Sequence, residues 1–439
     1  MESQPLPRTS IFEKRSLAAV FQMILLAATL TGCGGRPINV LGPVAETSPN
    51  ASKVEMLVMT TRAPSLVPGE MFSGERALNA SFAEMTISVP PPGVHKVGQV
   101  EWPRKLPSNP KTDFATIEAD EINRDKAEKW LNVSVKKSPD HSVLVFIHGF
   151  NNRYEDAVYR FAQVVHDSGA RSVPILATWP SRGSLLAYGY DRESTNYSRN
   201  GLEKLFQYLA KDPDVREVNI LAHSMGNWLT LESLRQMAIR NGRLPAKFKN
   251  VMLADADVDV DVFRQQLADM GEPRPSFTLF VSRDDRALAV SKRVWGDVGR
   301  LGAIDPTVSP YKEEIAANHM TVVDLTKIKA GDRLGHSKFA ESPQIVQLIG
   351  RRLADGQPLS DSRVGLGDNI VAATAGAAAA VGTGVALAVT APVAVLDQNT
   401  RENFGKHVEA LAGASPAAKN PAIVPVNCKV RDAVPGACK

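Results

Sequence analysis

The chain has 439 residues, a formal net charge of +4 and 44% hydrophobic residues. This length suits one large α/β domain with extensions, or two medium domains. Acidic and basic residues are interspersed, so the charge does not favour nucleic acid as the main partner. The three cysteines lie outside the central region without zinc-type spacing, and no metal or organic cofactor is indicated.

The N-terminus has the pattern of a secretory signal. Lys14 and Arg15 precede an apolar run at 17–30, and Leu-Thr-Gly follows directly before Cys33. The apolar run is too short for a comfortable transmembrane helix. A basic start, a short apolar stretch and small residues before a cysteine resemble the bacterial lipoprotein signal.

We therefore expect a signal peptide at 1–32, a lipid on Cys33 and a tether at 33–53. The lipid would anchor the protein to a membrane of the bacterial cell envelope, facing the periplasm. Gly34, where an aspartate would resemble an inner-membrane retention signal, weakly favours the outer membrane. A plain cleavable signal and an inner-membrane anchor are the alternatives.

Residues 54–354 alternate short apolar runs with amphipathic segments, whereas the many prolines at 90–116 indicate an extended loop. Apolar strands that alternate with helices predict parallel strands covered on both faces. We expect one α/β domain with a mostly parallel eight-stranded sheet between helices, which is a three-layer sandwich. The expected strands are 54–60, 82–89, 143–147, 173–177, 218–222, 250–253, 277–281 and 320–325, and the expected helices are 154–167, 195–210, 227–240, 260–270, 287–295 and 342–353.

The composition changes after the domain. Residues 355–368 read as a polar linker, and residues 369–396 are uncharged and rich in Ala, Gly and Val. As a helix this segment could cross a bilayer of roughly 30 Å, although alanine makes it weakly hydrophobic. Packing on the domain, pairing with another chain and lying on the membrane are the alternatives.

The polar tail at 397–439 contains the other two cysteines, Cys428 and Cys438. A disulfide between them would suit an oxidising periplasm. If residues 369–396 crossed the membrane, this pair and the lipid on Cys33 would lie on opposite sides, which argues against crossing.

The octapeptide LAHSMGNW at 221–228 has most features of a nucleophile elbow. An apolar strand leads to Ser224, and a helical pattern begins near Gly226, which is the strand–turn–helix context that the motif requires. Small residues two places on either side let strand and helix pass closely; Ala222 stands where a glycine is usual and adds one methyl group. Ser224 is therefore a candidate nucleophile, and the alternative is an ordinary turn with a capping serine.

A serine nucleophile needs a base and an acid that orients it. The expected chain order is nucleophile, acid and histidine, each after the carboxyl end of its own strand. Two adjacent aspartates follow a late strand, and we favour Asp285, which directly precedes a helix, over Asp284; Asp255 and Asp257 are weaker candidates. His336, between the last strand and the closing helix, is the expected base.

The oxyanion of an acyl-transfer reaction needs two amide donors. The N–H of Met225 follows the nucleophile and is the first candidate. The second is the N–H of Phe150, because His148-Gly149 after a buried strand resembles the oxyanion loop of lipases and esterases. We expect His148 to be structural, and Gly149 lets the backbone turn sharply.

Three aromatic residues follow the carboxyl end of another strand. Trp179, Tyr188 and Tyr190 are candidates for lining an acyl or leaving-group pocket. Packing within the loop is an equally good interpretation of all three.

Several stretches in the same order resemble the α/β-hydrolases, and within them a bacterial group catalogued as a domain of unknown function. The resemblance covers about residues 54–354, and in this group an alanine at the position of Ala222 is common. It implies the α/β-hydrolase fold and serine hydrolase chemistry, without indicating a substrate. The stretches are VMTTRAP, VFIHGFNNRYEDAVYRFAQ, ATWPSRGS with YGYDRES, LAHSMGN, ADADVDVDVF, VSRDDRALAVS and LGHSKF.

These observations predict a lipoprotein-type serine hydrolase that cleaves a small-molecule or lipid ester through an acyl-enzyme. Amide and thioester cleavage stay open, because the same triad serves all three. The alternative from another class is a non-catalytic binding or scaffold protein of the envelope on the same fold.

Overall fold

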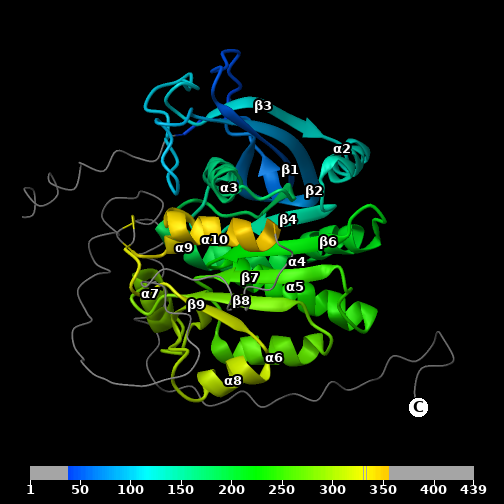
Figure 1. The fold of residues 1–439 in the computed structure, drawn as a ribbon, viewed down its shortest axis with the longest axis vertical. Helices are drawn as coiled ribbons and strands as arrows, with labels where there is room; N and C mark the ends of the chain where they lie inside the picture. Colours follow the sequence, from blue (N-terminus) through cyan, green and yellow to red (C-terminus); the bar gives the residue numbers. More distant parts are fainter. Residues whose placement is uncertain (1–37, 330, 333, 355–439) are drawn as a thin grey trace, which may run out of the picture. The chain divides into compact units, whose positions relative to one another are not determined.

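The computed structural model describes residues 38–354 apart from 330 and 333. A nine-stranded sheet in the order β3-β2-β1-β5-β4-β6-β7-β8-β9 forms its centre (Figure 1). The expected signal peptide, Cys33, the linker, the apolar segment and the cysteines of the tail lie outside the described residues. The strands are β1 Ser52–Pro64, β2 Phe72–Val89, β3 Ala115–Ile122, β4 Ser142–Ile147, β5 Val173–Thr178, β6 Glu217–His223, β7 Phe248–Ala254, β8 Ser276–Val281 and β9 Thr321–Asp324.

Helices follow most of the parallel strands and cover the sheet. The predicted helices are all present, with somewhat different bounds. The helices are α2 Arg124–Lys137, α3 Tyr154–Ser168, α4 Tyr188–Lys211, α5 Gly226–Asn241, α6 Val260–Met270, α7 Arg286–Val294, α8 Tyr311–Ala317, α9 Lys338–Glu341 and α10 Pro343–Ala354, with short 3-10 turns at Leu185–Ala187 and Leu301–Ala303.

The sheet separates two apolar cores. Along β4, Val143, Val145 and Ile147 face the core that α2, α4, α5 and α6 cover, whereas Leu144 and Phe146 face the core under α3 and α10. Every residue of β4 is buried, as expected for a central strand covered on both faces. The predicted three-layer arrangement is therefore confirmed.

The sheet has nine strands instead of the expected eight. The additional strand is β3, at a place where the sequence pattern predicts neither a strand nor a helix. Among the strands of the described residues, β3 pairs with β2 alone, in the antiparallel direction, and forms the edge of the sheet. Its sequence, ATIEADEI, is half polar, and Glu118, Asp120 and Glu121 are solvent-exposed. The helices α2 and α8 were also missed; α2 buries only Ala127, Leu131 and Val135 and has little apolar signal.

Part of the expected tether packs against the domain. Val40 and Leu41 are each 1% exposed and belong to the core under α3. The hydroxyl of Tyr159 donates to the carbonyl of Val40 at 2.9 Å, and the N–H of Leu41 donates to the carbonyl of Gly69 at 3.1 Å. Isolated apolar residues in a polar segment gave no periodicity, so sequence reasoning took this part for a tether.

Within residues 38–354, leaving aside 330 and 333, no helix combines the length and the apolar character needed to cross a membrane.

If residues 40 and 41 are part of the core, Leu41→Ala should lower the free energy of unfolding by about 2–5 kcal/mol, as for other buried leucines. Ile38→Ala, three residues earlier and 59% exposed, should change it by less than about 0.5 kcal/mol. Urea unfolding monitored by circular dichroism measures both. Equal and negligible effects would show that the segment is a tether after all.

Candidate active site

Ser224 lies in a tight turn between β6 and α5. Its φ of 53° is in the left-handed region, which a non-glycine residue adopts only where the surrounding structure enforces it. The N–H of Ser224 donates to the carbonyl of Ala254 at 2.9 Å, and the side-chain amide of Asn227 donates to the carbonyl of Ser224 at 2.9 Å. These bonds attach the turn to the end of β7 and hold the hydroxyl at the carboxyl edge of the sheet.

Two glycines allow this turn to pack against the end of β4. A Cβ on Gly226 would overlap the carbonyl oxygen of His148, and a Cβ on Gly149 would lie 2.7 Å from Cβ of Ser224. Ala222 is fully buried in β6, in register with Ile147 of β4. The close approach therefore requires glycine at 149 and 226, whereas the strand accommodates the methyl group of Ala222.

The side chains of Ser224, His336 and Asp285 meet at this turn. Nε2 of His336 lies 2.7 Å from Oγ of Ser224, and Nδ1 of His336 lies 2.6 Å from Oδ2 of Asp285. Asp285 follows β8 and His336 follows β9, so all three residues lie beyond carboxyl ends of strands. This chain of hydrogen bonds suits proton transfer from the hydroxyl to the imidazole, with the carboxylate orienting the ring.

The imidazole of His336 is held from several sides. Burial disfavours its charged form, but the hydrogen bond and the charge of Asp285 outweigh burial and raise the pKa of His336 to about 9. Nε2 of His223 donates to the carbonyl of His336 at 2.8 Å, and burial lowers the pKa of His223 well below its usual range. His223 was not predicted to have a role, although it directly precedes the serine in the motif.

The two adjacent aspartates have different partners. Oδ1 of Asp285 accepts from the N–H of Leu288 at 3.0 Å and caps α7, which leaves Oδ2 for His336. Oδ1 of Asp284 instead accepts from Nζ of the buried Lys338 at 2.7 Å. The geometry therefore assigns the histidine contact to Asp285.

The two weaker acid candidates also have no hydrogen bond to His336. Asp255 is fully buried, and neither of its carboxyl oxygens has a hydrogen-bond partner among the described residues. Burial raises the pKa of Asp255 well above its usual range. Asp257 accepts from the hydroxyls of Tyr188 at 2.6 Å and Ser291 at 2.5 Å.

The two predicted oxyanion donors flank the serine. Met225 follows Ser224 in the chain, and Phe150 follows Gly149, which packs against Cβ of Ser224. Among the hydrogen bonds of residues 38–354, neither the N–H of Met225 nor that of Phe150 has an acceptor. Two donors without a protein acceptor beside the hydroxyl are what a developing oxyanion requires.

Buried polar groups support the loop that carries Phe150. The guanidinium of Arg62 donates to the carbonyls of Asn152 at 2.7 Å and Ser181 at 2.9 Å. The carboxylate of Asp191 accepts from the N–H of Asn151 at 3.3 Å and from the hydroxyl of Ser181 at 2.5 Å. Burial lowers the pKa of Arg62 to about 10, so it stays charged at neutral pH. Sequence reasoning missed this role, although Arg62 and Asp191 lie in two of the quoted stretches.

His148 supports the same loop from beneath. Nε2 of His148 lies 2.8 Å from the hydroxyl of Thr178, and the ring stacks on Trp179 with centroids 4.9 Å apart. Burial, and secondarily the charge of Arg62, lowers the pKa of His148 to about 3. These contacts and the neutral form of the ring indicate that His148 supports the loop and does not transfer protons.

The three candidate pocket aromatics are in different environments. Trp179 is fully buried, and Tyr190 packs under Arg182, whose guanidinium carbon is 3.7 Å from the ring centroid. Trp179, in the loop after β5, and Tyr190, in α4, thus make packing contacts. Tyr188 is partly exposed and makes an edge contact with Phe150 at 5.0 Å between centroids. Of the three, Tyr188 is thus the one beside an expected oxyanion donor.

A mostly parallel sheet between helices, with these side chains beyond the carboxyl ends of its strands, defines an α/β-hydrolase. A family model described as "Alpha/beta hydrolase of unknown function (DUF900)" matches residues 123–352, which is more than half of the chain. The chain therefore belongs to this family, and the fold and group expected from the sequence are confirmed.

Two further similarities are weaker. The uncharacterized protein alr1448 of Nostoc sp. is 25% identical over 152 residues, which cover 29% of this chain and 39% of that protein. The chain thus spans about two fifths of the length of this relative. A solved structure from a study of two fungal esterases from Rhizomucor miehei matches over 71% of this chain and 84% of that one, with 13% identity and a TM-score of 0.29. A similarity of this size carries no argument about activity.

The close approach at the elbow can be tested by Gly226→Ala. The added methyl group would overlap the carbonyl oxygen of His148, so the free energy of unfolding should fall by about 1–3 kcal/mol. Gly189→Ala in α4 is the matched control, because no atom lies within 4 Å of the added carbon. It should leave stability unchanged or raise it. Urea denaturation compares the two, and equal effects would contradict the steric argument.

Proposed function

We propose that the protein is a serine hydrolase that cleaves carboxylic esters through an acyl-enzyme. The observation that carries the proposal is the continuous hydrogen-bond chain from Ser224 through His336 to Asp285, with distances of 2.7 and 2.6 Å. A serine turn of this kind stores backbone strain, which persists where function needs it.

In the first half of the reaction, His336 accepts the proton of Ser224 as the hydroxyl oxygen attacks the ester carbonyl. The N–H groups of Met225 and Phe150 stabilise the oxyanion of the tetrahedral intermediate. Asp285 holds the proton on Nδ1 and stabilises the imidazolium. The imidazolium then protonates the departing alcohol as the carbon–oxygen bond breaks.

In the second half, His336 accepts a proton from water, which attacks the acyl-enzyme. Collapse of the second tetrahedral intermediate releases the carboxylic acid and returns the proton to Ser224. Esters are the class we favour, because an alcohol is a better leaving group than an amine and places less demand on proton donation. The partly exposed Tyr188, beside Phe150, is our candidate for contacting the acyl or alcohol group.

Ser224→Ala should abolish labelling by a fluorophosphonate probe and lower hydrolysis of short p-nitrophenyl esters by roughly 10⁴–10⁶-fold, because the nucleophile is lost. In-gel fluorescence and initial rates measure the two effects. Ser309→Ala, at an exposed serine outside the site, should match the parent protein in both.

Labelling that survives in Ser224→Ala would contradict the assignment of the nucleophile. A folded parent protein that neither takes up the probe nor hydrolyses any acyl ester would favour the binding or scaffold alternative. Parallel assays with p-nitroanilides of the same acyl groups separate ester from amide cleavage.

The pH dependence of kcat/KM tests the pair His336 and Asp285. Only the neutral imidazole can accept a proton, so kcat/KM should rise with pH through the pKa of His336, which is about 9. Asp285→Asn removes the carboxylate that raises this pKa. The rising limb should therefore move to lower pH, while kcat falls by roughly 10⁴-fold.

Asp284→Asn is the matched control for this experiment, since Asp284 bonds to Lys338 and not to the histidine. Asp284→Asn should leave the rising limb of the pH profile of kcat/KM at the same pH as in the parent protein. Asparagine caps helices as well as aspartate does, so Asp285→Asn should keep α7 intact, which circular dichroism can check. A larger kinetic effect at 284 than at 285 would show that the acid is wrongly assigned.

A further inference from the structure

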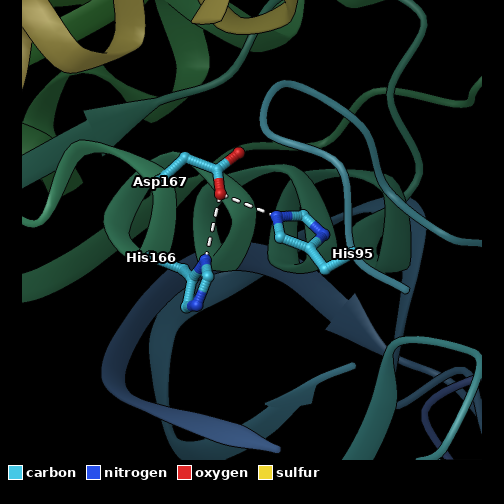
Figure 2. A group of neighbouring side chains, drawn as sticks. All are labelled: His95, His166 and Asp167. Atoms are coloured by element: carbon cyan, nitrogen blue, oxygen red, sulfur yellow. Dashed lines mark hydrogen bonds and ion pairs between the residues drawn. The ribbon is translucent and has the colours of Figure 1, made fainter. Parts of the chain in front are cut away.

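The loop after β2 meets the last turn of α3 in a cluster of three metal-ligand residues. Figure 2 shows His95 of the loop and His166 of the helix directed at the same carboxylate, that of Asp167. Nε2 of His95 lies 2.7 Å from Oδ1 of Asp167, and Nδ1 of His166 lies 3.0 Å from the same oxygen. The three atoms all lie within 4.8 Å of one another.

Further groups fix the orientation of these side chains. Nδ1 of His95, the ring nitrogen away from the cluster, lies 2.7 Å from Oε2 of Glu101. The second carboxylate oxygen of Asp167 accepts from the N–H of Gly98 and from Nε2 of Gln163, each at 2.7 Å. In metal sites, a ligating histidine typically donates its other N–H to a carboxylate, and ligating carboxylates are themselves hydrogen-bonded.

The arrangement of the ring nitrogens is compatible with metal binding. Neutral imidazoles and an ionised carboxylate are the forms that bind metal. With Nε2 of His95 on a metal ion, its Nδ1–H would still be donated to Glu101, whose carboxylate lies 2.7 Å away.

We propose that Nε2 of His95, Nδ1 of His166 and Oδ1 of Asp167 bind a zinc ion. Two imidazoles and one carboxylate suit Zn²⁺ better than Mg²⁺ or Ca²⁺, which prefer oxygen ligands. Zinc–ligand bonds of about 2.0–2.2 Å in a tetrahedron place ligand atoms about 3.3 Å apart. The separations of 2.7 and 3.0 Å to Oδ1 of Asp167 would therefore widen by about 0.6 and 0.3 Å. Water would complete the tetrahedron.

The burial of the three side chains suits an enclosed metal site that an ion can reach from solvent. The side chains of His95 and Asp167 are 5% and 0% exposed, and that of His166 is 29% exposed. The ion would thus be enclosed by the first two ligands and reached from solvent beside the third.

The position of the site indicates a structural role. Helix α3 begins after the carboxyl end of β4 and ends before the amino end of β5, so its last turn lies at the edge of the sheet opposite Ser224. The ion would attach the loop that contains His95 and Gly98 to α3. Zinc is therefore expected to raise stability, because it binds the folded chain, and the proposal is independent of the proposed hydrolase activity.

The test uses the full chain freed of metal with EDTA and then dialysed against chelator-free buffer. Zinc sulfate is titrated in competition with a chromophoric chelator, and bound zinc is counted by inductively coupled plasma mass spectrometry. We expect one zinc per chain and a rise in the melting temperature with zinc that equal concentrations of magnesium or calcium do not produce.

Three variants locate the site. His166→Ala removes a ligand on a partly exposed helical position and should abolish stoichiometric binding and the thermal shift. Asp167→Asn should do the same if it folds. Glu101→Gln keeps all three ligands and should weaken binding by about 10–100-fold, as loss of an orienting carboxylate does at other metal sites.

His319→Asn is the matched control, at an exposed histidine whose φ of 50° asparagine tolerates. It should bind zinc as the parent does. Absence of stoichiometric zinc from the parent would overturn the proposal, and so would zinc binding that His166→Ala leaves unchanged, because such zinc would be bound elsewhere in the chain.

Discussion

The contact between the end of β4 and the start of α5 is the constraint on which the site depends. There is no room for a side chain at Gly226 beside the carbonyl of His148, or at Gly149 beside Ser224. Because β4 and β6 are paired in register, this contact brings both expected amide donors to the serine through backbone alone. Donors fixed in this way need little reorganisation when charge develops on the substrate.

Around this contact, burial determines which ionisable groups carry charge. Burial lowers the pKa of His148 to about 3 and that of His223 well below its usual range, and both rings act as hydrogen-bonding and stacking groups. The guanidinium of Arg62 makes five hydrogen bonds, among them one to the carbonyl of Asn152. Burial lowers its pKa to about 10, which still leaves it charged at neutral pH. At the serine itself, Asp285 outweighs the burial of His336 and raises its pKa. The site thus combines a buried support, in which Arg62 is charged and His148 is neutral, with one hydrogen-bonded histidine–carboxylate pair.

Much of the fold could be predicted from local patterns, because central parallel strands are continuous apolar runs such as that of β4. The strand β3 and the helix α2 were missed, because an edge strand and a sparsely buried helix carry little apolar signal. The packed segment at Val40 was missed for the same reason. Ser224, Asp285 and His336 could be selected by their order after strands, whereas Arg62 acts on backbone carbonyls that no sequence pattern reveals.

The sequence by itself determined the order of strands and helices, the serine elbow and the short list of partners for the serine. These features follow from hydrophobic periodicity and from the rule that loops after parallel strands meet at one edge. Only the tertiary structure decided between Asp284 and Asp285, since the helix cap and Lys338 direct adjacent carboxylates to different partners. It also brought His95 to Asp167, 72 positions away, because proximity between distant residues arises from packing and not from spacing along the chain.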